Sequence, residues 1–185
     1  MFVRLFGMDL SKIPPGLIGQ VAGMVADYIT GSRKKYLSRA TPLSSEQRGL
    51  MEPFFSPEIL DRVRILALRD ERIQDPGFYT MARMMGFKDL PSFSDVSAVT
   101  FVDVIVAHEE FSDALLFHEL VHVVQYAQLG IKEFGARYVS GFVTGGGYEG
   151  IPLEKNAYEL EHRYSADKRQ AFSVADEVER FIGRV

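Results

Sequence analysis

The chain has 185 residues, enough for one sizeable hydrophobic core, and its 46% hydrophobic and 25% charged residues are ordinary for a soluble globular protein. The formal net charge of −4 argues against nucleic acid as a partner, because binding to phosphates needs a basic surface. The absence of cysteine excludes disulfides and thiolate metal sites.

The N-terminal sequence and its apolar stretch bear on localisation. Met1–Asp9 is too short and carries charge too early for a signal peptide. Leu17–Ile29 contains Gln20 and Asp27 and is too short to cross a bilayer. These features predict a soluble, cytoplasmic protein without a membrane partner, with export by a non-classical route left open. No segment determines the oligomeric state.

The first third of the chain predicts a long helix followed by a loop. The pair Pro14-Pro15 suits the start of a helix that runs to about Tyr36, with an apolar face of regular spacing. Residues 40–57 are rich in proline and serine, which predicts a loop with one short helix at Ser45–Met51.

Two segments of the middle third have the character of strands. Val63–Leu68 alternates well enough for a strand, and Ala98–Ala107, rich in β-branched residues, is the strongest strand in the chain. A helix at Gly77–Met85, closed at Gly86, is expected between them. Strand, helix, strand and a following helix predict an α+β fold with a small sheet backed by helices.

The C-terminal third predicts further helices, at Ile131–Phe142, Pro152–Lys168 and Gln170–Ile182. The glycines at 145–147 precede the second of them and indicate a mobile segment or a close backbone approach. They do not form a phosphate loop, because no Gly-Lys-Ser/Thr follows and no strand precedes them.

The apolar run Phe111–Leu129 contains the motif His-Glu-x-x-His. His118 and His122 are four residues apart, so on a helix they lie one turn from each other on one face and can bind the same divalent metal ion. Glu119 lies on the adjoining flank, where it can hold a metal-bound water without being a ligand. Gln125 continues this polar stripe on a helix that is otherwise apolar all round, as buried helices are.

These residues also have a plainer interpretation, a core helix with two buried, hydrogen-bonded histidines. Burial of the Glu119 carboxylate then costs on the order of several kcal/mol unless a cation or another partner lies nearby. A bound metal ion removes that cost, and imidazole and carboxylate ligands at this spacing fit zinc best. We therefore expect a zinc site.

A catalytic zinc ion takes three protein ligands and keeps one position open for water, so one ligand must come from outside this helix. The candidates are Glu149, Glu154, Glu159, Glu161, His162 and His108. Glu154 lies in the first turn of the helix after the Gly-rich segment, which lets it project into a cleft. A solvated first-turn carboxylate, favoured by the helix dipole, is the alternative for this residue.

Two segments resemble the gluzincin class of zinc metallopeptidases, and more narrowly short bacterial metallopeptidase-like domains of unknown substrate. They read His-Glu-Leu-Val-His-Val-Val-Gln over residues 118–125 and Pro-Leu-Glu-Lys-Asn-Ala-Tyr over residues 152–158. The resemblance covers about residues 60–165 and implies a zincin-like α+β fold, with a small sheet packed on the buried zinc helix. We expect a single domain over residues 1–185, on which residues 1–57 pack as a helical extension.

The resemblance also implies roles for individual residues. His118, His122 and Glu154 would be the zinc ligands, and Glu119 the general base. Ala98–Ala107 would be the strand along which an extended peptide lies.

One position departs from the family pattern. Tyr158 stands where many gluzincins have an acidic residue that bonds a ligand histidine. Gln125, Asn156 or Glu161 could take that role, and nothing in the sequence chooses among them.

Together these residues predict zinc-dependent hydrolysis of peptide bonds in a peptide or protein substrate. Zinc polarises the carbonyl group and lowers the pKa of its water, and Glu119 passes the water's proton to the leaving amine. The oxyanion needs a further donor, for which we expect Tyr148 on the Gly-rich segment, with Tyr138 and Arg137 behind it.

Two other functions stay open at this point. The first is a zincin-like module that binds metal and a protein partner with little or no turnover, although an inert metal site does not need Glu119. The second is a latent peptidase whose cleft is covered by the C-terminal helix or the N-terminal segment, which would gain activity when that end is trimmed.

Overall fold

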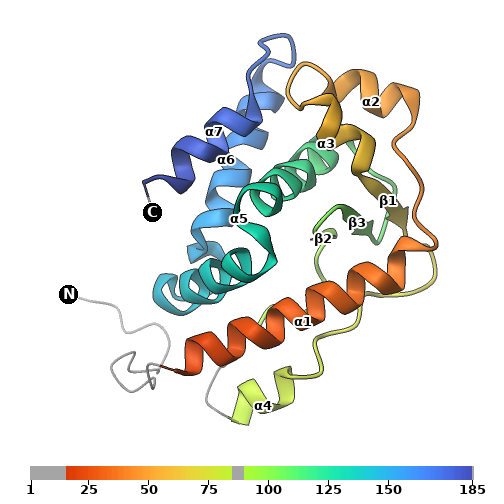
Figure 1. The fold of residues 1–185 in the computed structure, drawn as a ribbon. Helices are drawn as coiled ribbons and strands as arrows, with labels where there is room; N and C mark the ends of the chain where they lie inside the picture. The colour runs from red at the N-terminus through yellow and green to blue at the C-terminus, as the bar shows by residue number, and fades with distance from the viewer. Residues whose placement is uncertain (1–15, 85–89, 185) are drawn as a thin grey trace.

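The computed structural model describes residues 16–84 and 90–184, and within these ranges the predicted α+β fold is confirmed (Figure 1). The strands are β1 (Arg64–Ala67), β2 (Ala98–Phe101) and β3 (Val104–Ala107). The helices are α1 (Leu17–Leu37), α2 (Ser45–Met51), α3 (Pro57–Arg62), α4 (Tyr79–Met84), α5 (Asp113–Gly145), α6 (Pro152–Ala166) and α7 (Val174–Ile182), with a short 3₁₀ helix at Tyr148–Gly150.

The three strands form a small mixed sheet in the order β1-β3-β2. β3 lies between a parallel partner, β1, and an antiparallel partner, β2. The prediction of one long strand over Ala98–Ala107 is therefore wrong, because the chain reverses at Val102 and Asp103 to make a hairpin. Of its two halves, β3 is the central strand and is fully buried, so only β2 can lie beside an extended peptide.

A partly buried ion pair ties this hairpin to α1. The guanidinium of Arg33 donates to both carboxylate oxygens of Asp103, over 2.5 and 3.0 Å. Val102 has a φ of 65°, a left-handed conformation that β-branched residues rarely adopt. Tertiary packing and the Arg33 bond thus hold a turn that local preference disfavours.

α5 is the central helix, with the sheet on one side and α6 and α7 on the other (Figure 1). Ser112 caps its N-terminus by accepting a hydrogen bond from the amide of Leu115. Its first half is buried from Leu116 to Tyr126, which is why an apolar run all round the helix is tolerated there. At Gly130 the backbone becomes left-handed, with a φ of 71°, so the predicted break between two helical segments is confirmed.

Other element bounds match the predictions to different degrees. The short helix at Ser45–Met51 is confirmed in both of its ends, through a capping box between Ser44 and Gln47. α3 is not among the predicted helices, although its N-terminus is capped by Ser56. α7 begins at Val174 rather than Gln170. The expected helix start at Pro14-Pro15 and the expected helix end at Gly86 fall outside the described residues.

The apolar side chains of the core gather on both sides of α5. Phe117 packs between the aromatic rings of Phe54, Phe55 and Tyr164, which joins α5 to the α2–α3 segment and to α6. On the other side, Gly135 of α5 lies against α1, where a β-carbon would meet Val25 at 3.5 Å. Among the described helices, none is both long and apolar enough to cross a membrane.

Candidate metal centre

The first half of α5 supplies three polar side chains to one buried face. His118, Glu119 and His122 are exposed by only 5%, 5% and 6%. Their positions follow from helical spacing. His122 lies one turn beyond His118 on the same face, and Glu119 lies on the adjoining flank. The local part of the sequence prediction thus holds, and the motif lies in the interior rather than at the surface.

A glycine-rich turn brings the start of α6 back against the end of α5. The backbones of Gly145 and Gly150 pass so closely that a β-carbon on either would overlap the other. Gly146 and Gly147 adopt φ values of 78° and 125°, which reverse the chain. Of the two expectations for this segment, the close backbone approach is the one observed, and it carries Glu154 into the interior, where it is 5% exposed.

His118, His122 and Glu154 form a group that could hold a metal ion. The Nε2 atoms of the two histidines are 3.2 Å apart, and each is 3.5 Å from Oε2 of Glu154. Ligand atoms bound tetrahedrally at about 2.0–2.1 Å from zinc are about 3.3 Å apart, close to these separations. The spacing of the donors therefore fits one small divalent cation.

The partners of the two histidines decide which ring nitrogens face this point. Nδ1 of His118 lies 3.0 Å from Oε2 of Glu161, and Nδ1 of His122 lies 2.9 Å from Oε1 of Gln125. Both partners accept hydrogen bonds, so both Nδ1 atoms carry a proton and both Nε2 atoms face Glu154. Gln125 is in turn held by Asn156, whose Oδ1 accepts from its Nε2 over 3.0 Å.

Of the three residues named for this supporting role from the sequence, Glu161 and Gln125 bond the histidines, and Asn156 bonds Gln125. Glu161 lies seven residues after Glu154, two turns along the same face of α6, and reaches His118 from there. Tyr158, between them, is 52% exposed and packs its ring 4.5 Å from the ring of His118. The position that departs from the family pattern thus makes a ring contact, and the acidic partner comes from one turn further on.

Three electron-pair donors that meet at one buried point repel one another unless a cation lies between them. Without a metal, a proton takes that place: burial acts to lower the pKa of His122, but the facing carboxylate of Glu154 outweighs it and raises this pKa to about 9. Although burial acts to raise the pKa of Glu154, the two histidines hold it well below its usual value. The three side chains together therefore favour a cation between them, either a proton or a metal ion.

Two tyrosines donate hydrogen bonds to Glu154, one to each oxygen of its carboxylate. The hydroxyl of Tyr138 lies 3.0 Å from Oε1, and that of Tyr148 lies 2.8 Å from Oε2. Burial and the nearby carboxylate raise the pKa of both hydroxyls, so both stay protonated donors. Arg137, named with them from the sequence, instead bonds Glu133 and the carbonyl of Ile182.

Glu119 is held by the sheet rather than by the candidate metal ligands. The hydroxyl of Thr100, on β2, donates to its Oε2 over 2.7 Å and to its backbone carbonyl over 3.2 Å. Burial raises the pKa of Glu119, partly offset by His122 and His118. Thr100 is a site residue that the sequence reading missed, since no local pattern marks which side chain of a strand will face the helix.

The remaining candidates for a third ligand lie elsewhere. Glu149, Glu159 and His162 are exposed. His108 is buried, but its Nε2 accepts from the amide of Ile73, and its Nδ1 bonds the carbonyl of Val96. It fastens the segment before β2 to the end of β3.

Comparisons with models of known protein families, with curated proteins and with solved structures find no match to this chain.

Proposed function

We propose that the protein is a zinc-dependent peptidase with a zincin-like arrangement of one edge strand, one metal helix and a third ligand from a later helix. The observation that carries this proposal is the buried convergence of His118, His122 and Glu154, with Glu119 beside them. An inert structural site needs the ligands alone. The buried carboxylate of Glu119 next to them accepts a hydrogen bond from Thr100 through Oε2, and among the described residues none donates to its second oxygen, which can accept a proton.

When bound by these three ligands, zinc supplies the Lewis acidity that lowers the pKa of water and polarises a peptide carbonyl group. Glu119 accepts a proton from the attacking water as the new C–O bond forms, and donates it to the amine nitrogen as the C–N bond breaks. Thr100 holds Glu119 in one orientation during both transfers.

The role of Tyr148 as donor to the oxyanion stays a prediction. Its hydroxyl lies on Glu154, 2.8 Å from Oε2, so it borders the reaction site but is already hydrogen-bonded. We propose that Tyr148 and Tyr138 first serve to keep Glu154 ionised and correctly oriented. A change of Tyr148→Phe that lowers kcat while zinc content is kept would assign it to the oxyanion as well.

The proposal is tested by metal content and activity together. Metal is quantified by mass spectrometry in the wild type, Glu119→Gln, His122→Ala and Glu154→Ala, and each variant is assayed on a quenched peptide library. We expect about one zinc per chain, loss of zinc in His122→Ala, weaker retention in Glu154→Ala, and zinc without activity in Glu119→Gln.

Two other results would contradict the peptidase proposal. Stoichiometric zinc without cleavage of any peptide would favour the metal-binding protein module over the enzyme. Absence of bound metal after refolding with zinc would return the two histidines to the role of core residues and overturn the proposal.

A further inference from the structure

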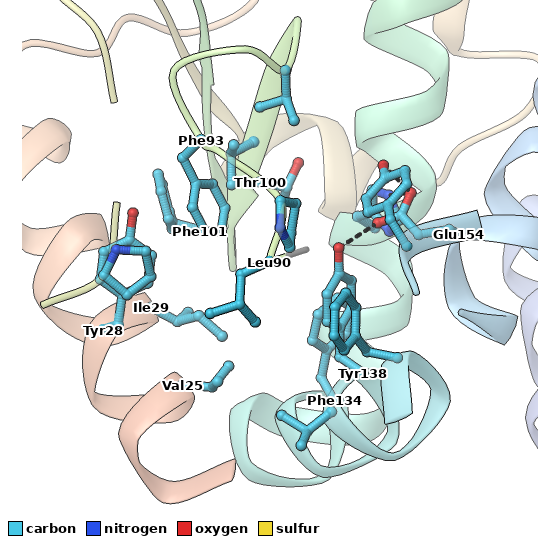
Figure 2. A pocket seen from close by; sticks show the side chains of 18 of the residues that line it. Val25, Tyr28, Ile29, Leu90, Phe93, Thr100, Phe101, Phe134, Tyr138 and Glu154 are labelled. Atoms are coloured by element: carbon cyan, nitrogen blue, oxygen red, sulfur yellow. Dashed lines mark hydrogen bonds and ion pairs between the residues drawn. The ribbon is translucent and has the colours of Figure 1, made fainter. Parts of the chain in front are cut away.

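An apolar pocket of about 150 Å³ adjoins the candidate metal-ligand group. Its walls come from α1, from residues 76–82 and 90–101, and from the second half of α5 (Figure 2). Val25 and Ile29 of α1 face Phe134 and Tyr138 of α5 across the pocket, and Glu154 lies at one end (Figure 2). The pocket and the candidate reaction site are thus one continuous space.

The charged groups of the described lining are confined to that end of the pocket. Among the described lining residues, the charged side chains are Glu119, His122 and Glu154, all of the metal centre. The hydroxyl of Tyr28 donates to the carbonyl of Gln74, so its polar atom is already paired. Away from the metal centre, the walls therefore offer an incoming group mainly apolar and aromatic surface.

Size and polarity together define what can enter. An apolar cavity of about this volume holds a benzene molecule. A basic or acidic side chain would lose its hydration among walls that are mainly apolar and aromatic away from the metal end. A methyl side chain would leave most of the space unfilled.

We infer that this pocket receives a bulky aromatic side chain of the residue beside the scissile bond, which makes the protein a peptidase selective for large aromatic residues. The inference rests on the proposed function and extends it to substrate class. It also assigns a role to α1, which lies outside the part of the chain that the family resemblance covers. Val25 and Ile29 become determinants of specificity.

The first test compares peptides that differ in one residue. The zinc-loaded protein is assayed on quenched peptides with Phe, Leu, Ala, Lys or Glu on either side of the scissile bond. We expect kcat/KM for Phe to exceed that for Ala by about 10- to 100-fold, with Lys and Glu lowest. Equal cleavage of all five series would overturn the inference while leaving the peptidase proposal in place.

A substitution in the pocket wall tests whether the pocket causes the selectivity for aromatic side chains. Val25→Phe fills the pocket, so it should lower kcat/KM for Phe peptides at least tenfold while changing that for Ala peptides by less than threefold. Gln20→Phe is the matched control, because it adds the same ring to an exposed position of the same helix. An equal loss on all substrates, or none, would contradict the assignment.

A second variant decides the question if Val25→Phe does not fold. Ile29→Ala enlarges the pocket, so the ratio of kcat/KM for naphthylalanine over phenylalanine peptides should rise at least threefold. An unchanged ratio in folded Ile29→Ala, with a cooperative thermal transition, would count against a side-chain pocket.

A binding experiment without metal separates this inference from the proposed function. Benzene is titrated into metal-free protein while the methyl NMR signals of Val25 and Ile29 are followed. We expect saturable shifts that are lost in Val25→Phe and kept in Gln20→Phe. The metal-free protein could show saturable shifts while the zinc-loaded protein cleaves no peptide. That result would overturn the peptidase proposal, and the substrate class with it, but would leave the pocket as a binding site. Absence of shifts would overturn the pocket itself.

Discussion

At the scale of single residues, the site is organised by which atom of each side chain is already engaged. Nδ1 of His118 and Nδ1 of His122 are used by Glu161 and Gln125, so the two Nε2 atoms face Glu154. One proton or one metal ion can satisfy this arrangement, and the two compete for it.

The first prediction concerns this competition. The pKa of His122 is raised to about 9 in the folded, metal-free protein, above its unfolded value of 6.5, so its stabilising charge is fully present below pH 6.5 and lost as pH rises through 9. The melting temperature of metal-free protein should therefore fall over this interval, while zinc affinity rises. Calorimetry at pH 7.5 in buffers of different ionisation enthalpy should show about one proton released per zinc, and release of none would contradict the assignment.

The second prediction concerns the partner of His118. Glu161→Gln keeps the size of the side chain but weakens its hold on Nδ1, so zinc affinity should fall about 10- to 100-fold without a large change in melting temperature. Chelator competition measures the affinity. Glu159→Gln, an exposed change on the same helix, is the control and should bind zinc as the wild type does.

At the scale of elements, the link between α5 and α6 determines whether the third ligand reaches the first two. Gly145 and Gly150 allow the two backbones to touch, and Gly141 lies against Pro152, where a β-carbon would come within 2.5 Å of Cδ. The positions of Glu154 and Tyr148 both depend on this contact, because Tyr148 lies inside the loop that it closes and Glu154 follows that loop directly.

The third prediction is that a single methyl group at this contact disturbs the metal centre. Gly150→Ala would overlap the carbonyl of Gly145 and displace the start of α6, at a cost of about 1–3 kcal/mol in unfolding free energy and at least tenfold in zinc affinity. Gly49→Ala, where a β-carbon meets nothing within 4 Å, is the control. Equal zinc affinity in the two variants, measured by chelator competition, would show that the glycine contact does not position Glu154.

At the scale of the whole molecule, the metal centre and the pocket lie where three distant parts of the chain meet. α1, the β2–β3 hairpin and α5 enclose the pocket, and the Arg33–Asp103 ion pair joins the first two. A metal ion bound by α5 and α6 would add a further connection across the core.

The fourth prediction follows from this connection. Zinc that binds only the folded chain, present at 100 times its dissociation constant, stabilises it by about 2.7 kcal/mol, which for a chain of this length raises the melting temperature by about 5 to 10 °C. Differential scanning calorimetry with zinc and with EDTA measures the shift. The His122→Ala variant should show none, and an equal shift in that variant would indicate zinc bound elsewhere.

Features of this protein that depend on interactions between neighbouring residues were predictable from the sequence, and features that depend on distant contacts were not. The buried helix with His118, Glu119 and His122, its break at Gly130 and the capped helix at Ser45–Met51 were predictable, because each depends on residues within one or two turns of each other. The α+β class followed from the order of such elements. These features were determined by the sequence through local backbone geometry.

The tertiary structure alone decided the rest, because it depends on segments that are far apart in the chain. It chose Glu154 over five other candidates and engaged Gln125, Asn156 and Glu161 together. It also bent the expected long strand into a hairpin at Val102, against local preference, since Arg33 holds the neighbouring aspartate. The Thr100 contact and the apolar pocket arise in the same way, from packing between elements that no local spacing records.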